Sequence, residues 1–143
     1  MLSLPLGTNS REGMFVNDLD KINLVADLFV AAVTTGSRQG LEQVFDASAV
    51  IWHNTDGVEQ SAAESINVII ATFRNRPFSY EKMQRAVFPT GFVQQHVITA
   101  DGGAFEMPAC LVVEVKNSKI TRINEYYDGV RVAALKSSRR NTG

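Results

Sequence analysis

The 143-residue chain has little that would tie it to a special environment: one cysteine, Cys110, a formal net charge of −1 and no long apolar run. A single cysteine cannot form an intramolecular disulfide, so nothing points to an oxidising compartment. A net charge this small supplies no field that would draw the protein to nucleic acid. No stretch reaches the ~20 apolar residues that span a bilayer, and residues 1–16 lack the features of a signal peptide. We therefore expect a cytoplasmic protein with no nucleic-acid partner and no membrane partner.

Motifs for nucleotides and metals are also missing from the sequence. It contains no Gly-rich phosphate loop, no nucleophile elbow and no dinucleotide fingerprint, so we expect no cofactor. Its two histidines, His53 and His96, stand apart from any cluster of cysteines or carboxylates. We therefore expect no metal site.

The patterns that are present predict helices first and strands afterwards. Apolar residues recur at helical spacing over about residues 17–35, and Ser37 can cap a short second helix. A strand-like run covers residues 49–54, and Ser61 with Glu64 forms a capping box for a third helix that stops before Pro77. From Phe78 onward the period becomes two, which predicts strands over 79–88, 92–100, 104–116 and 119–128.

This order of elements predicts an α+β domain with helices on one face of a largely antiparallel sheet. The chain length fits one domain, which we place at residues 17–135. It would follow an N-terminal extension, 1–16, and precede a disordered basic tail, 136–143.

Alternation along the first strand bears on which side chains line a pocket. Trp52 and Asn54 share one face and His53 takes the other. If Trp52 walls a cavity, the Asn54 amide lies in it too, and His53 faces away. The alternative is that Trp52 belongs to the core and Asn54 only satisfies the end of a strand.

Two further residues could carry chemistry. His96 lies in a strand whose two faces the sequence does not distinguish, and a lone histidine there is often structural. A carboxylate partner would fix its tautomer, and Asp128 is the candidate, although an aspartate before Gly129 is often only a turn former. Cys110 lies on a strand where it can touch a cavity or be an inert buried thiol.

Three stretches of the chain resemble the nuclear transport factor 2-like superfamily: residues 29–46, the strand 50–54, and the final hairpin 112–128 with its aromatic pair before Asp128. Within it, SnoaL-like polyketide cyclases, limonene epoxide hydrolases and ketosteroid isomerases are the most similar. The resemblance implies a cone-shaped, curved antiparallel (mixed) sheet wrapped around three N-terminal helices. It also implies an apolar pocket for a small organic molecule.

The resemblance matches individual positions unevenly. Ketosteroid isomerases carry a tyrosine, a carboxylate base and a second acid where this chain has Phe29, Asn54 and Cys110. Compared with limonene epoxide hydrolases, Asp128 matches one catalytic aspartate and Asn54 the water-holding asparagine, while Trp52 takes the place of their tyrosine.

Where limonene epoxide hydrolases have their arginine and second aspartate, this chain has His96 and Ile98. Polyketide cyclases of this fold rely on an aspartate and a histidine, with which His96 and Asp128 are compatible.

These observations lead to a hypothesis of a cofactor-independent acid–base enzyme, a lyase or isomerase acting as a cyclase, dehydratase or isomerase on a small apolar oxygenated molecule. Its catalytic residues would be His96 and Asp128. The substrate-binding residues would be Trp52, Asn54, Phe29, Cys110 and Tyr126. Alternatives are a non-catalytic ligand-binding or dimerisation module and an altered epoxide hydrolase.

The late strands are apolar on both faces, with Leu111 and Val113 on one side and Cys110 and Val112 on the other. Because helices cover only one face of such a sheet, we expect a homodimer through the other face.

Overall fold

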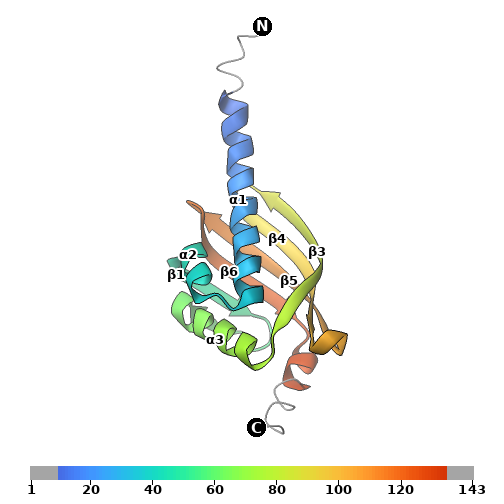
Figure 1. Cartoon of the computed structure of the whole chain (residues 1–143). Coiled ribbons are helices and arrows are strands. Elements are labelled where there is room, and N and C mark those ends of the chain that lie inside the picture. The colour runs from blue at the N-terminus through green and yellow to red at the C-terminus, as the bar shows by residue number, and fades with distance from the viewer. Residues whose placement is uncertain (1–9, 135–143) are drawn as a thin grey trace.

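The computed structural model describes residues 10–134 and has the α+β architecture that the sequence predicts. Residues 1–9 of the expected extension and the expected basic tail lie outside the described residues. Figure 1 shows the three helices on one side of a curved sheet, with α1 running across it. None of the helices described is long and apolar enough to cross a bilayer.

The helices are α1 (Ser10–Thr35), α2 (Arg38–Val44) and α3 (Ala62–Asn75). Helix α1 begins before the expected residue 17, whereas both predicted caps are present. The Ser37 hydroxyl accepts a hydrogen bond from the Gly40 amide, and Ser61 and Glu64 form the complete capping box. These local signals therefore fix where α2 and α3 begin.

The sheet has six strands in the order β2-β1-β6-β5-β4-β3. Their bounds are Phe45–His53 for β1, Glu59–Ser61 for β2, Phe78–Phe88 for β3, Gly91–Ala100 for β4, Phe105–Lys116 for β5 and Lys119–Tyr127 for β6. β1 and β6 run parallel and the other neighbours antiparallel, so the sheet is mixed. The short strand β2 was not predicted.

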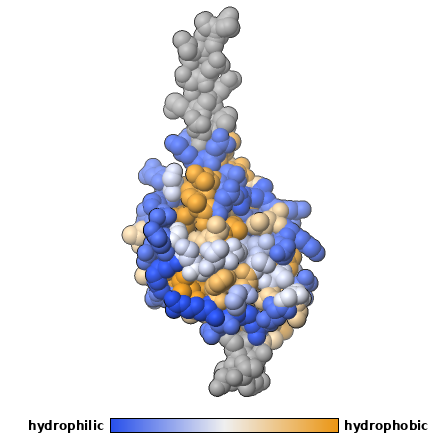
Figure 2. Space-filling model, in the orientation of Figure 1, coloured by the Kyte–Doolittle hydropathy of each residue, from blue (hydrophilic) through white to orange (hydrophobic). Residues whose placement is uncertain are grey.

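The core lies between the helices and the inner face of the sheet. Phe29 of α1 is buried there and meets Phe45 of β1 edge-on, with ring centroids 6.0 Å apart. On the same helix, Leu24 and Leu28 are exposed among polar neighbours, and Figure 2 shows this mixture of hydropathy on the helix-covered side. Phe29 is therefore a core residue and not the pocket wall that the sequence led us to expect.

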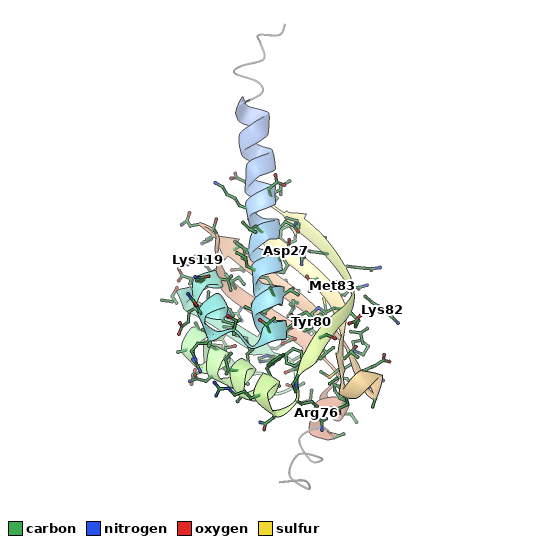
Figure 3. All side chains as sticks on the ribbon, in the orientation of Figure 1. Asp27, Arg76, Tyr80, Lys82, Met83 and Lys119 are labelled. Atoms are coloured by element: carbon green, nitrogen blue, oxygen red, sulfur yellow. The ribbon has the colours of Figure 1, made fainter. Side chains whose placement is uncertain are left out.

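A β-bulge in β3 changes which of its residues face inward. Glu81 pairs with Val97 and Gln84 with Gln95, so three steps along β3 match two along β4, and Lys82 adopts a φ of 55°. In consequence Tyr80 and Arg85 both face the helices. Figure 3 shows Lys82 and Met83 at the outer side of this strand.

Candidate functional site

The register of β1 with β6 reverses the expected orientation of the first strand. Ile51 pairs with Ile123 and both are buried on the inner face, so His53, two residues further on, also faces inward. Trp52 lies on the outer face, where it packs edge-on against Tyr126 at a centroid distance of 5.4 Å. The prediction that Trp52 lines the inner pocket while His53 faces away was wrong. The buried Ile51–Ile123 pair sets the opposite parity.

Asn54 occupies a structural role at the end of β1. Its amide Nδ2 donates to the Tyr127 carbonyl over 3.1 Å, and its Oδ1 accepts from the Tyr127 N–H over 3.0 Å. The side chain thus extends the ladder between β1 and β6 by one step. The expectation that Asn54 lies in the pocket with Trp52 gives way to the structural alternative, and its amide is occupied by backbone.

His96 faces the interior, whereas Asp128 does not. His96 is only 3% exposed. The Asp128 side chain is 45% exposed, and its Oδ1 accepts from the backbone N–H of Val130 at the start of the helical turns at 129–134. The predicted His96–Asp128 pair is therefore wrong, because Asp128 caps the C-terminal turns as a turn former.

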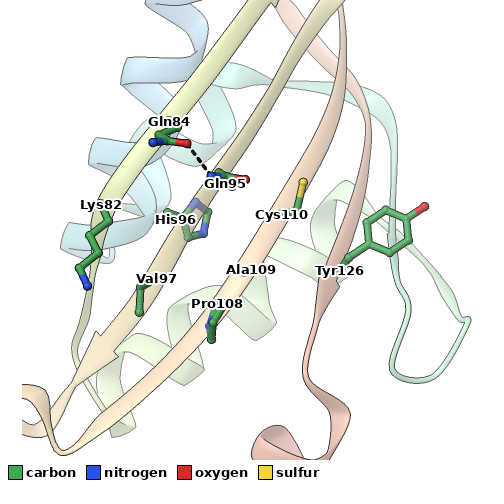
Figure 4. Close-up of a pocket in the computed structure, with 9 residues that line it drawn as sticks. All are labelled: Lys82, Gln84, Gln95, His96, Val97, Pro108, Ala109, Cys110 and Tyr126. Carbon is green, nitrogen blue, oxygen red and sulfur yellow. Dashed lines mark hydrogen bonds between the residues drawn. The ribbon is translucent and has the colours of Figure 1, made fainter.

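The outer face of the sheet carries a hollow of about 550 Å³, which Figure 4 shows. Cys110 of β5 and Tyr126 of β6 pair across their strands and contribute to its lining. These two expected ligand-binding residues therefore face away from the helices, since the buried residues Ala109 and Leu111 alternate with Cys110 along β5.

The inner face brings together five polar or titratable side chains that we call the inner polar cluster: His53, Tyr80, His96, Glu125 and Tyr127. His53 Nε2 lies 3.1 Å from Glu125 Oε1, and the His53 ring stacks on Tyr127 at 5.6 Å. The Tyr80 and His96 rings stack at 3.7 Å. A carboxylate only accepts hydrogen bonds, so Nε2 of His53 carries the proton toward Glu125.

Burial and the charge of Glu125 perturb the rest of the cluster. Burial lowers the pKa of His96 to about 4, and the negative charge of Glu125 acts in the opposite direction by raising it. Burial raises the pKa of Tyr80 and of Tyr127, and the Glu125 charge raises both further. At neutral pH the phenols of Tyr80 and Tyr127 and the imidazole of His96 are therefore uncharged hydrogen-bonding groups near Glu125. Perturbed groups that gather in this way are typical of functional sites.

A chain of hydrogen bonds supports His96 from α1. Asp27 Oδ1 and Asn23 Oδ1 each accept from Arg85 Nη1 over 2.7 Å. Arg85 Nε donates to Gln94 Oε1 over 2.9 Å, and Gln94 Nε2 lies 3.1 Å from His96 Nδ1. The other ring nitrogen, Nε2, finds no hydrogen-bond partner among the residues that the structure describes.

The sequence reasoning found His96 but missed the other four members of the inner polar cluster. The available signal for Glu125 was its parity with Ile123, an apolar residue in the same strand. Tyr80 could not be placed without the bulge. Within residues 10–134, no three metal-ligating side chains form a group that could hold a metal ion.

The curved mixed sheet, its three helices and the inner polar cluster define a small cone-shaped α+β protein. No family model and no curated protein matches the chain. Among solved structures, a candidate polyketide cyclase from Xanthomonas campestris pv. campestris is similar with a TM-score of 0.72 and 13% identity, over 82% of this chain and 97% of that one. A candidate isomerase from Bacillus subtilis is similar with a TM-score of 0.67 and 14% identity, over 82% of this chain and 93% of that one.

An LEH-like epoxide hydrolase from M. tuberculosis is similar with a TM-score of 0.66 and 12% identity, over 81% of this chain and 89% of that one. Likeness at such low identity establishes the fold and leaves the chemistry to the residues of this chain. The chain has the nuclear transport factor 2-like fold, as its resemblance predicted.

Proposed function

We propose that the protein is a cofactor-independent acid–base enzyme that acts on a small oxygenated molecule at the inner polar cluster. The observation that carries this proposal is the placement of one inward-facing carboxylate, Glu125, near the buried His96 and the half-buried Tyr80 and Tyr127, whose pKa values its charge alters. The Glu125 side chain is 14% exposed, so it is largely enclosed.

The arrangement suits proton transfer next to a carbonyl group. Glu125 would take a proton from the carbon beside the carbonyl, and the electron pair of the broken C–H bond would move toward the carbonyl oxygen. Neutral hydrogen-bond donors stabilise the resulting enolate, and the phenols of Tyr80 and Tyr127 are such donors. Return of the proton at another carbon gives isomerisation, and attack of the enolate on a second carbonyl gives aldol cyclisation.

The solved structures support this proposal only as analogy, because the similar proteins named above include a candidate polyketide cyclase and a candidate isomerase. An altered epoxide hydrolase is less well supported. Of its expected residues, Asn54 is engaged with the backbone of Tyr127, and Asp128 accepts from the backbone N–H of Val130.

Exchange of the α-protons of cyclohexanone for deuterium, followed by NMR in heavy water, tests the proposal. The protein should accelerate exchange, and Glu125→Gln should reduce the acceleration by about 100-fold or more, because the base is lost. Glu114→Gln, which removes an exposed carboxylate from the neighbouring strand β5, is the matched control and should keep the full rate. Equal rates for wild type and Glu125→Gln would contradict the role of Glu125.

We also propose that the outer face of the sheet forms a homodimer. No helix covers this face in Figure 1, and it carries Trp52, the half-buried Cys110 and the exposed Val112 and Tyr126. An apolar surface of this kind is usually covered in a soluble protein. A non-catalytic role as a dimerisation module would use the same face.

A further inference from the structure

The buried Nε2 of His96 is the feature that carries an inference beyond the proposed function. The ring is 3% exposed, Tyr80 lies flat against one of its faces, and Nε2 has no hydrogen-bond partner among the described side chains and backbone groups. A buried polar group without a partner is costly, so native proteins keep few of them, and often at functional sites.

The hydrogen-bond chain decides what His96 can do with that nitrogen. Arg85 can only donate, so its contact assigns the oxygen of the Gln94 amide and turns the NH₂ group toward His96. Nδ1 of His96 must then accept, which in a neutral imidazole places the proton on Nε2. Nε2 is therefore a donor that points at no acceptor of the described chain.

The surroundings favour an uncharged acceptor over an anion. Glu125 already places one negative charge close enough to influence His96. Arg85, the cation of the hydrogen-bond chain, is committed to Asp27 at 2.7 Å and to Gln94. A carboxylate ligand would thus meet repulsion from Glu125, and Arg85 would not be free to offset it, whereas a carbonyl oxygen meets a neutral N–H donor.

The register also indicates where such a ligand would lie. Ala109 pairs with His96 on one side and with Tyr127 on the other, so it separates the two on the inner face. Neighbouring strands are about 4.8 Å apart, so β4, which carries His96, and β6, which carries Tyr127, are about 10 Å apart. Between them, Ala109 of β5 contributes only a methyl group. Ala109 therefore lies between the two rings on the inner face of the sheet.

We propose that Gln94 and Arg85 are positioning residues that hold His96 as an Nε2–H donor, and that this donor binds the carbonyl oxygen of an uncharged ketone over Ala109. The proposal rests on the proposed function for the choice of a carbonyl compound, whereas the assignment of the tautomer stands on geometry alone.

Nitrogen-15 NMR of the histidine rings tests the tautomer without any substrate. In the wild-type protein His96 should show a protonated Nε2 and an unprotonated Nδ1. Gln94→Glu keeps an oxygen for Arg85 but offers His96 only an acceptor, so the proton should move to Nδ1. Gln95→Glu changes the neighbouring outward-facing residue of β4 and should leave the tautomer unchanged. A wild-type ring protonated on Nδ1 would overturn the proposal without the use of any variant.

Binding of two matched probes, cyclohexanone and cyclohexanecarboxylate, tests the ligand class by NMR titration. Cyclohexanone should shift the His96 Nε2 signal saturably. Gln94→Glu should weaken the binding of cyclohexanone about tenfold, which is the typical effect of losing one hydrogen bond. Ala109→Val should weaken binding while it preserves the tautomer. Preference for the carboxylate, no saturable shift with the ketone, or equal affinity in Gln94→Glu would each refute the ligand assignment. Ketone binding without proton exchange would instead refute the proposed function and leave this inference standing.

Discussion

Tyr80 lies flat against His96, with ring centroids 3.7 Å apart and planes inclined by 13°. The two residues come from neighbouring strands, and the bulge at Lys82 lets Tyr80 and Arg85 act on the same interior. Tyr80 covers the imidazole from one side, while Gln94 occupies its Nδ1. This enclosure explains why burial dominates the pKa of His96.

A pH dependence of stability follows from that pKa. The pKa of His96 is about 4 in the folded protein against an ordinary value of 6.5, so between these values the unfolded chain binds more protons. The free energy of unfolding should therefore fall as the pH drops from 6.5 to 4. The upper limit of this fall is about 3 kcal/mol.

Urea unfolding of wild type and His96→Gln at several pH values measures this effect. The carboxylates titrate in both proteins, so the difference between the two curves isolates the histidine. The difference should change between pH 6.5 and 4 and be level above pH 6.5. Parallel curves over the whole range would show that His96 does not titrate in this way.

Two substitutions of Asn54 should have different effects on the end of β6. Asn54→Ala removes both hydrogen bonds to Tyr127 and should cost about 1–3 kcal/mol. Asn54→Asp retains an oxygen that accepts from the Tyr127 N–H. It loses the amide donor, so a carboxylate oxygen then faces the Tyr127 carbonyl oxygen. Hydrogen exchange of the Tyr127 amide should remain slow in Asn54→Asp and become fast in Asn54→Ala. Equal protection in the two variants would show that the side chain does not hold this strand.

Local signals in the sequence were sufficient for most of the fold. The Ser61 capping box, the Ser37 cap and the change to period two at Phe78 predicted α3, α2 and the four late strands to within a residue or two. These features depend on neighbours in the chain, and a sequence contains that information directly.

The site was harder to predict because it depends on register. A shift by one residue moves a whole strand to the other face. Nothing local distinguishes Trp52 from His53, and only the parity with Ile123 favours Glu125 over Tyr126 as the inward-facing residue. The pairing of Ile51 with Ile123 decides which residues of β1 and β6 face inward, and it joins two strands that lie far apart in the sequence. The bulge at Lys82 likewise altered the parity of β3 without any proline or glycine to mark it.

The two neighbouring residues Phe29 and Leu28 give a test of which face of α1 is buried. Phe29 is 3% exposed and Leu28 is 48% exposed. Phe29→Ala should reduce the free energy of unfolding by about 3–5 kcal/mol, because a buried aromatic ring leaves a cavity. Leu28→Ala should change it by about 0.5 kcal/mol or less. Comparable losses in urea unfolding for the two variants would contradict the orientation of α1.

The outer face of the sheet should determine the oligomeric state. Val112 and Tyr126 are 38% and 43% exposed on the outer face of the sheet, which none of the described helices covers, and a two-fold interface would bury the same residues on both copies. Sedimentation at micromolar concentration should give about twice the 15.7 kDa mass of the chain. Val112→Asp places a charge in that interface and should give monomers, since an unpaired buried charge is costly. Leu28→Asp, on the helix side, should remain a dimer. A wild-type protein that sediments as a monomer would contradict the proposed interface, and dissociation by Leu28→Asp alone would move the interface to the helix side.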